Sequence, residues 1–522
     1  MSFGEADRRQ LSERGIGEAE AERQLALLRQ PPQPFRLLRP CTPGDGIRVL
    51  GEEAAEGLVT DQGDAAAAGR FGKLVPASGA ATRMFRTLLE LLQEDPPPSA
   101  EQLARRAGAG DGPAGDALRL LAELPRVPFR DALAAACAAR GSDLDTLRER
   151  GDAVPVLAAL LGPEGLGLAD LPKGLVPFHR HPGGEVRTPL EEHLVEGAGY
   201  LADGRGACRL HFTVPPEHRE RFRAEAQAAS ARIAARREVR CEVGLSVQEP
   251  STDTLALDPD TGEPFRDDDG TLLLRPGGHG ALLHNLQALG GDLLYLKNID
   301  NVLPEGPAQA AVAHWQRVLG GLLVRLEARA RELRRRLAGE DSRQLLIAAE
   351  SFVEELGRPL PGHDPSPAAR RRRVLDLLDR PLRVCGVVPN AGEPGGGPFW
   401  VRRPDGEISV QIVERAEVPG DDEEQAAVFA SSTHFNPVQL ACALRDADGL
   451  PYELDRFVDP RAVFIARKSH QGRPLLALER PGLWNGAMAG WHTVFVEVPG
   501  DTFAPVKTVF DLLRPAHQAA GS

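Results

Sequence analysis

One stretch in the middle of the chain has the clearest pattern of apolar and polar positions. A short apolar run at 272–274 leads into the glycine-rich sequence 276–280, where missing β-carbons permit a sharp turn and the close approach of a flat or anionic ligand. Residues 281–289 have the spacing of a short helix, which the pair Gly290-Gly291 would end. Residues 292–297 are almost wholly apolar, as in a strand buried on both faces. The pattern therefore predicts a strand, a turn, a helix and a second strand.

An acidic residue, Asp300, follows the second of these strands within the sequence Asn298-Ile299-Asp300-Asn301. In open α/β sheets, ligands bind beyond the carboxyl ends of the strands. A carboxylate there suits Mg²⁺, which prefers oxygen ligands and shares its coordination with substrate phosphates. The alternative is that Asp300 only caps a turn or a helix. We predict that Asp300 is a ligand of Mg²⁺.

A second strand–turn–helix pattern occupies residues 72–92. Residues 73–75 start a strand, 76–82 are mostly small, and 83–92 have the pattern of a helix. Backbone N–H groups in such a turn can hold a phosphate, and Arg83 would add a forked positive charge. The loop contains one glycine and matches neither a Walker loop nor GxGxxG, so an ordinary turn is the alternative.

The remaining pattern predicts an α/β fold in which a mixed, mainly parallel sheet is interrupted by large helical insertions. Strand-like segments recur at 209–214, 242–247, 382–388 and 493–498, whereas 95–170 and 305–380 are helical. We divide the chain into an N-terminal helical and irregular segment (1–69), the first part of the core (70–304) with its insertion (95–170), a second insertion (305–380) and the second part of the core (381–522).

Several polar residues follow predicted strands or precede predicted helices. Gln248 lies in a polar cluster suited to the edge of a base or a sugar, although a turn is the alternative. Asn436 precedes a helix predicted to begin at Pro437, where its amide suits sugar hydroxyls. Trp484 and Asn485 combine an aromatic surface with an amide, as in many sugar sites, and core packing is the alternative.

Three histidines lie close together in the sequence, at 179, 181 and 193. His193 falls in a predicted amphipathic helix, 190–199, and the other two precede it. They do not have the spacing of a helical HxxxH pair. We therefore predict that they are loop histidines with hydrogen-bond partners and not metal ligands.

The overall composition excludes several classes of protein. The 522 residues carry a net charge of −13, which disfavours nucleic acid as a partner because such proteins need a basic face. No apolar run is long enough to span a membrane, and the polar N-terminus contains no signal segment, which predicts a cytoplasmic protein. None of the six cysteines forms a CxxC pair, so neither a zinc site nor a disulfide framework is predicted.

The use of basic residues is strongly biased towards arginine. Only five of the 62 basic residues are lysines, at 73, 173, 297, 468 and 507. A lysine is a compact point charge suited to phosphate, whereas arginine is a planar fork. All except Lys468 lie in or beside the segments that carry candidate chemistry, so the pattern favours a role for them at phosphate groups.

Several of these segments resemble motifs of the nucleotide-sugar pyrophosphorylases. VPASGAATRMF (75–85) is similar to their signature loop, LPKGLVPF (171–178) to their activating lysine segment, and FAPVKTVFDLL (503–513) to their phosphate-binding lysine segment. PGGHGALL and NIDN resemble their Pro-Gly-His-Gly and Asp-Asn motifs. Most of the chain, including THFNPV and LWNGAMAGW, resembles more closely a bacterial family of unknown function that is distantly related to these enzymes.

The resemblance implies a glycosyltransferase-A-like (Rossmann-like) nucleotidyltransferase core that joins a nucleoside triphosphate, UTP favoured, to a sugar 1-phosphate and releases pyrophosphate. Mg²⁺ is the implied cofactor. The implied catalytic residues are Arg83, Lys173 and Lys507; the implied binding residues are Ala77, Ser78, Gly79 and Ala80 for the triphosphate, Gln248, Gly278, His279 and Gly280 for the nucleoside, Glu414, Asn436 and Asn485 for the sugar, and Asp300 for the metal.

Two other functions stay open from the sequence. The signature loop lacks the family's usual paired glycines, which favours a sugar-nucleotide sensor with weak catalysis as one alternative. Another phosphoryl-transfer enzyme acting on a sugar is the second. The identity of the base, the sugar and the oligomeric state are not predicted.

Overall fold

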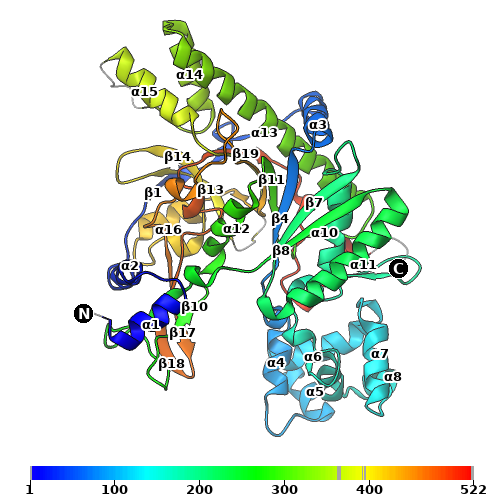
Figure 1. The fold of residues 1–522 in the computed structure, drawn as a ribbon. Coiled ribbons are helices and arrows are strands. Elements are labelled where there is room, and N and C mark those ends of the chain that lie inside the picture. The colour runs from blue at the N-terminus through cyan, green and yellow to red at the C-terminus, as the bar shows by residue number, and fades with distance from the viewer. Residues whose placement is uncertain (1–2, 361–365, 391, 393–394, 519–522) are drawn as a thin grey trace. The chain divides into compact units, whose positions relative to one another are not determined.

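The computed structural model describes residues 3–360, 366–390, 392 and 395–518, and the chain forms two compact units (Figure 1). Each unit combines three stretches that are far apart in the sequence. The predicted domains follow the elements along the chain, whereas the units follow contacts in space. The first unit comprises Met1–Leu74, Ser246–Leu296 and Trp315–Gly500, and the second comprises Val75–Leu245, Lys297–His314 and Asp501–Ser522.

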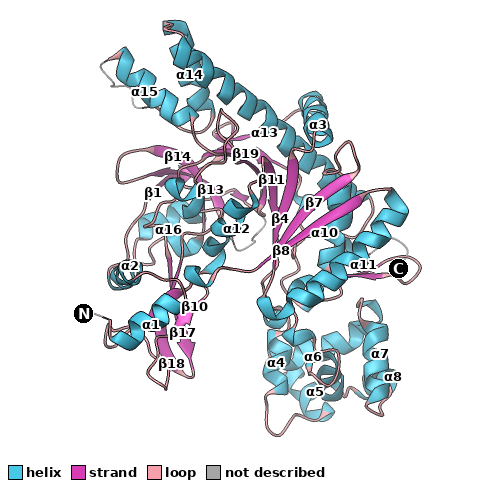
Figure 2. Ribbon diagram, viewed as in Figure 1, coloured by secondary structure: helices cyan, strands magenta, loops and turns pink. Residues whose placement is uncertain are grey.

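The first unit is built on a mixed sheet with the strand order β2-β3-β19-β12-β16-β11-β4. Figure 2 labels three of these strands, β19, β11 and β4. The pairs β2–β3, β3–β19, β19–β12 and β11–β4 are parallel, and β12–β16 is antiparallel. The strands are β2 (Thr42–Pro43), β3 (Gly46–Arg48), β4 (Phe71–Pro76), β11 (Leu293–Lys297), β12 (Leu382–Pro389), β16 (Gln439–Ala443) and β19 (His492–Glu497), with β15 (His434–Phe435) beside β12.

Two smaller antiparallel sheets complete the strands of the first unit. Their orders are β1-β13-β14 and β10-β9-β18-β17. These strands are β1 (Arg36–Pro40), β9 (Thr254–Leu257), β10 (Leu274–Arg275), β13 (Gly397–Arg402), β14 (Ile408–Val413), β17 (Phe464–His470) and β18 (Arg473–Glu479). The helices are α1 (Glu5–Glu13), α2 (Glu18–Arg29), α3 (Glu52–Ala67), α12 (Leu282–Leu289), most of α13 (Pro307–Gly339), α14 (Arg343–Glu355), α15 (Pro367–Leu378) and α16 (Glu423–Ala430).

The second unit begins with the last residues of β4 and contains β7 and most of β8. The helices α4 to α8 lie together in one group (Figure 1). The elements are α4 (Arg86–Leu92), α5 (Ala100–Gly108), α6 (Gly112–Glu123), α7 (Arg130–Ala139), α8 (Leu144–Arg150), α9 (Ala153–Leu161), the hairpin β5 (His179–Arg180) and β6 (Val186–Arg187), α10 (Pro189–Ala198), β7 (Ala207–Thr213), α11 (Arg219–Arg237) and β8 (Arg240–Ser246).

The predicted fold class is confirmed: the protein is α/β, with a mixed, mainly parallel sheet and large helical insertions. The central strand–turn–helix–strand prediction is also confirmed, as β10, α12 and β11. The strands predicted at 73–75, 209–214, 242–247, 382–388 and 493–498 are found as β4, β7, β8, β12 and β19. All six cysteines are free, and among the described residues no helix has the length and apolarity needed to cross a bilayer.

Two local predictions were wrong, and the segment near the C-terminus has little regular structure. The helix expected at 83–92 is split into a 3₁₀ turn, Ala81–Arg83, and α4, because the buried Phe85 adopts a non-helical backbone between them. The helix expected after Pro437 is instead a turn into β16, where Val438 has a left-handed φ of 56°. The segment after Lys507 forms only a 3₁₀ helix, Val509–Leu513.

The helix α10 differs from the amphipathic helix predicted from its sequence, because every residue from Pro189 to Ala198 is buried. Its three buried glutamates are each paired with a basic or imidazole side chain of the second unit. Glu191 contacts Arg232, Glu192 contacts His179 and His181, and Glu196 contacts Lys297. The glutamates of α10, which in the sequence indicate a solvent-facing side, are therefore buried and form ion pairs with other segments of the unit.

Candidate functional site

Three of the predicted site residues, Lys173, Asp300 and Lys507, meet in the second unit. Asp300 Oδ2 accepts hydrogen bonds from Lys173 Nζ at 2.9 Å and from Lys507 Nζ at 3.1 Å. Asp300 follows β11, as predicted, Lys173 lies in a 3₁₀ turn, and Lys507 precedes the last 3₁₀ helices. The cluster places two positive charges on one carboxylate, which makes it a candidate site for anionic groups.

The two lysines differ in exposure, and this affects what each can do. Burial raises the pKa of Asp300, but the charges of Lys173 and Lys507 outweigh it and hold the pKa below its ordinary value, so the carboxylate is ionised. Lys173 is buried with it, whereas the side chain of Lys507 is 61% exposed. Lys507 can therefore move to an incoming phosphate while Lys173 keeps Asp300 paired.

Backbone contacts hold the Lys507 segment at this carboxylate. Val506 N–H donates to the carbonyl of Asp300 at 3.0 Å, and Lys173 Nζ donates to the carbonyl of Val506 at 2.9 Å. Asn301 Oδ1 accepts from Ala504 N–H at 3.2 Å. The three segments thus support one another independently of the ion pairs.

The small-residue loop predicted to hold phosphate lies beside Lys173. Lys173 N–H donates to the carbonyl of Gly79 at 3.0 Å, and Ala81 N–H donates to that of Leu171 at 2.9 Å. Gly79, Ala80 and Arg83 are exposed, and Ser78 is half-buried. Ala77 differs from them, because it is buried and its N–H donates to the carbonyl of Thr213, so its role is to anchor the loop to β7.

The predicted nucleoside residues lie in the first unit, where Gln248 Nε2 donates to the carbonyl of Gly278 at 3.4 Å. The glycines of this turn are required by packing. A β-carbon at Gly277 would lie 2.4 Å from the carbonyl oxygen of Thr252, and one at Gly280 would lie 2.3 Å from that of Pro481. The close approach that we predicted for a ligand is thus made by the chain's own backbone.

Substituting Gly280 with alanine is expected to lower the free energy of unfolding of the first unit by about 1–3 kcal/mol, because the new methyl group overlaps backbone atoms that cannot rotate away. Gly420→Ala is the matched control in the same unit, since a β-carbon there meets nothing within 4 Å. Urea unfolding followed by tryptophan fluorescence measures the effect at Gly280, because all four tryptophans lie in the first unit. Equal stability of Gly280→Ala and wild type would contradict the packing argument.

His279 is held in a fixed orientation in the first unit. Its ring stacks on Trp484 with the centroids 4.1 Å apart, and its Nδ1 accepts from Leu483 N–H at 3.0 Å. Burial lowers the pKa of His279 to about 4, so the ring is neutral near pH 7. A neutral imidazole with Nε2 protonated can donate a hydrogen bond to a ligand.

Two of the predicted sugar residues lie next to this imidazole. Glu414 Oε1 accepts from Trp484 Nε1 at 3.0 Å and lies 4.0 Å from His279 Nε2. Asn485 donates to the carboxylate of Glu417 at 3.0 Å, and its Oδ1 is buried without a hydrogen bond to the described part of the chain. Polar groups and an aromatic ring are thus gathered in one place, as a sugar site needs.

Asn436 is the third residue that the resemblance assigned to the sugar. Asn436 holds its own loop, with Nδ2 donating to the carbonyl of Gly386 at 2.9 Å and Oδ1 accepting from Val438 N–H at 3.1 Å, so its contact with sugar stays a prediction. Glu417 was missed by the sequence interpretation. It shares the hydrogen-bond network of Asn485, and no motif marks it, because only the fold brings it there.

Glu417 predicts a measurable pH dependence, because burial raises its pKa to about 8. The folded protein then binds a proton that the unfolded chain has lost, so stability falls as the pH rises from about 5 to about 8 and levels off above it. The loss is expected to reach at least about 1 kcal/mol, the equivalent of one pKa unit. Urea unfolding of the first unit at several pH values measures it. A Glu417→Gln variant should lose this slope, and an unchanged slope would contradict the assignment.

The family described as "Domain of unknown function (DUF4301)" matches residues 4–518 of the chain. The chain belongs to the DUF4301 family. A search of the curated proteins finds no match to this DUF4301 protein.

Among solved structures, the DUF4301 protein is similar to the uridine diphosphate N-acetylglucosamine pyrophosphorylase of Trypanosoma brucei, with 14% identity, a TM-score of 0.47, and 98% of this chain and 79% of that chain covered. It is also similar to the UDP-glucose pyrophosphorylase of Leishmania major in complex with UDP-glucose, with 15% identity, a TM-score of 0.44, and 98% and 79% covered. A putative UDP-N-acetylglucosamine pyrophosphorylase of Entamoeba histolytica matches with 10% identity, a TM-score of 0.40, and 87% and 79% covered.

Proposed function

We propose that this DUF4301 protein is a nucleotidyltransferase that joins a nucleoside triphosphate, UTP favoured, to a sugar 1-phosphate and releases pyrophosphate. The observation that carries the proposal is the cluster of Lys173, Asp300 and Lys507 beside the loop 77–83. It combines an ionised carboxylate, two ammonium groups and a small-residue loop. Phosphoryl and nucleotidyl transfer depend mostly on such positioning and charge neutralisation.

The proposed reaction is a substitution at the α-phosphorus. A phosphate oxygen of the sugar 1-phosphate forms a bond to the α-phosphorus while the bond from that phosphorus to the oxygen bridging the β-phosphorus breaks. Pyrophosphate leaves with the bonding electron pair. The attacking phosphate is already ionised at neutral pH, so no general base is needed. Lys507, Lys173 and Arg83 would neutralise the phosphate charges as they redistribute.

Mg²⁺ fits this site through Asp300. Both lysines contact the same carboxylate oxygen, Oδ2, which leaves Oδ1 to offer to a cation. Mg²⁺ is commonly held by one or two carboxylates together with substrate phosphates and waters, so one ionised aspartate is a sufficient protein ligand. When bound, Mg²⁺ would supply further neutralisation of the phosphate oxygens.

The nucleoside and the sugar are assigned to the first unit. Gln248, Gly278 and His279 are proposed for the base and ribose, and Glu414 and Asn485 for the sugar. The stacked and hydrogen-bonded network around His279 supports this assignment, because it combines a neutral donor, a carboxylate and a buried amide oxygen.

The proposal is tested by measuring pyrophosphate release with Mg²⁺, a panel of nucleoside triphosphates and pooled sugar 1-phosphates. We expect release that needs both substrates and is lost in Asp300→Ala. Lys468→Ala is the control, because Lys468 forms a partly exposed ion pair with Glu479. Nucleotide binding without any release would favour the sensor instead. Release of nucleoside diphosphate would favour a different phosphoryl transfer, and the absence of both binding and release would exclude all three.

A further inference from the structure

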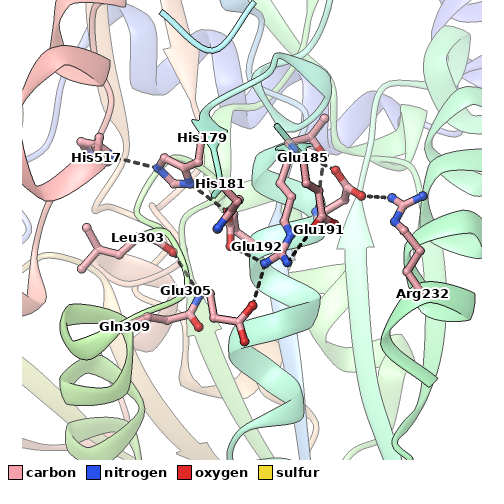
Figure 3. A network of polar contacts seen from close by, with 12 residues as sticks. His179, His181, Glu185, Glu191, Glu192, Arg232, Leu303, Glu305, Gln309 and His517 are labelled. Carbon is pink, nitrogen blue, oxygen red and sulfur yellow. Dashed lines mark hydrogen bonds and ion pairs between the residues drawn. The ribbon is translucent and has the colours of Figure 1, made fainter. Parts of the chain in front are cut away.

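A second buried cluster in the second unit takes no part in the proposed reaction. His179 on β5 and His181 just after it approach one carboxylate oxygen of Glu192 on α10 (Figure 3). His179 Nδ1 lies 3.0 Å from Glu192 Oε1, and His181 Nε2 lies 2.6 Å from the same atom. The three side chains are buried, and each directs a donor atom to the same point. Alternate residues of a strand share a face, which is why a His-x-His sequence can achieve this.

We propose that His179, His181 and Glu192 bind a zinc ion. Their donor atoms all lie within 4.8 Å of one another, and two imidazoles with one carboxylate are a ligand set that zinc accepts. Zinc–ligand distances of about 2.0–2.2 Å place neighbouring ligand atoms slightly above 3 Å apart, so side-chain shifts of about 1 Å would admit the ion. Three protein ligands leave the fourth position for water.

The environment of the Glu192 carboxylate favours the binding of a cation. Its second oxygen, Oε2, is buried and forms no hydrogen bond to the described part of the chain. The guanidinium of Arg187 is the nearby charge, at 3.9 Å, but it is hydrogen-bonded to Glu185 and Glu305. A buried carboxylate oxygen without a donor is costly, and a bound metal ion would compensate for it.

His517, near the C-terminus, contacts the proposed ligand His179 and is not itself a ligand. Its Nδ1 lies 2.9 Å from His179 Nε2, and the two rings are stacked with their centroids 5.2 Å apart. A metal on His179 Nδ1 requires the proton on Nε2, which then donates to His517. Ligating histidines usually donate their other ring N–H in this way, and the partner fixes the orientation of the ring.

The zinc site would position the segment that carries Lys507. His517 lies ten residues after Lys507 in the same unit, and Asp511 between them accepts from Lys507 N–H at 2.8 Å. Fixing His517 on His179 therefore restrains both ends of this segment, since Val506 is held at Asp300. The zinc assignment itself does not depend on the proposed nucleotidyl transfer.

The experiment measures metal content in the full-length protein. Wild type is loaded with Zn²⁺, dialysed against a weak chelator and analysed for metal, and we expect about one zinc per chain. Glu192→Gln and His181→Asn should lose it, with affinity weaker by at least about 100-fold, and His517→Asn should be weaker by about 10–100-fold. His193→Gln is the control, because His193 contacts the backbone at Asn298 and Ile299 instead.

Cobalt provides a second measurement that needs no variant. Co²⁺ added to the metal-free wild type should give the visible absorption of a tetrahedral nitrogen–oxygen site, and Zn²⁺ should abolish it. Wild type without bound zinc and without this absorption would overturn the proposal, and the cluster would then be a proton-sharing network. Zinc retained equally by Glu192→Gln would place the metal elsewhere and overturn it as well. Since none of these readouts measures catalysis, an inactive protein that binds zinc would separate this inference from the proposed function.

Discussion

A Lys173→Met variant is expected to release pyrophosphate about 10²–10³-fold more slowly than wild type, the usual effect of removing one preorganised charge from an active site. The reason lies in the two contacts of its ammonium group. Lys173 Nζ donates to Asp300 Oδ2 and to the carbonyl of Val506, so the substitution removes a charge and releases the segment that carries Lys507. Lys507→Met should lose the phosphate contact but keep Asp300 paired, and is expected to have the smaller effect on stability.

The kinetic effect must be separated from loss of structure, because Lys173→Met leaves Asp300 buried beside one cation instead of two. The double variant Lys173→Met/Asp300→Asn removes both charges of the buried pair. It should regain most of the thermal stability that the single variant loses, and it should stay inactive. Steady-state assays at saturating Mg²⁺ with Lys468→Met as the control measure the rates. A Lys173→Met enzyme within about threefold of wild type in kcat/KM would contradict a catalytic role.

The largest effect on stability is expected at the buried pair of Glu196 and Lys297. Lys297 Nζ donates to Glu196 Oε2 at 2.5 Å, and both side chains are 1% exposed. Replacing Glu196 with glutamine leaves a buried ammonium without its counter-charge, which is expected to lower the free energy of unfolding by about 3–5 kcal/mol. Tyr200, whose hydroxyl donates to Glu196 Oε1 at 3.2 Å, can still bond to glutamine, so the change acts mainly on the charge.

This prediction concerns the second unit, where tryptophan fluorescence reports nothing because the tryptophans lie in the first. Hydrogen exchange followed by mass spectrometry on peptides from α10 measures it directly. Glu220→Gln is the matched control in the same unit, since its pair with Arg223 is exposed and should cost less than about 1 kcal/mol. The double variant Glu196→Gln/Lys297→Met should recover much of the lost protection. Unchanged exchange in the single variant would show that the pair does not stabilise this unit.

The few lysines of this arginine-rich chain have two different kinds of partner. Lys173 and Lys507 lie at Asp300, as the resemblance implied, but Lys297 is used to neutralise a buried glutamate. The sequence pattern alone does not separate these uses, because a lysine at the end of an apolar strand has the same neighbours in the chain in either case. What differs is the side chain brought to it by α10.

The fold class and most of its elements could be predicted from local signals in the chain. Apolar runs and glycine positions are local signals, so β4, β7, β8, β11, β12, β19 and α12 could be predicted within a few residues. The resemblance also implied phosphate or metal roles for Asp300, Lys173 and Lys507, and in the structure these three side chains meet. The polarity of α10 misled the local interpretation, because a helix that is buried on all sides by paired charges has the composition of an exposed one.

Which of the charged and imidazole side chains contact one another depends on the tertiary fold. Lys173 and Lys507 reach Asp300 across 127 and 207 positions of the chain, and His517 reaches His179 across 338. Periodicity extends over a few turns of helix or a few residues of strand and contains no information on such distances. Glu192 and Glu417 were missed for this reason: their chemistry comes from burial and from partners supplied by other segments.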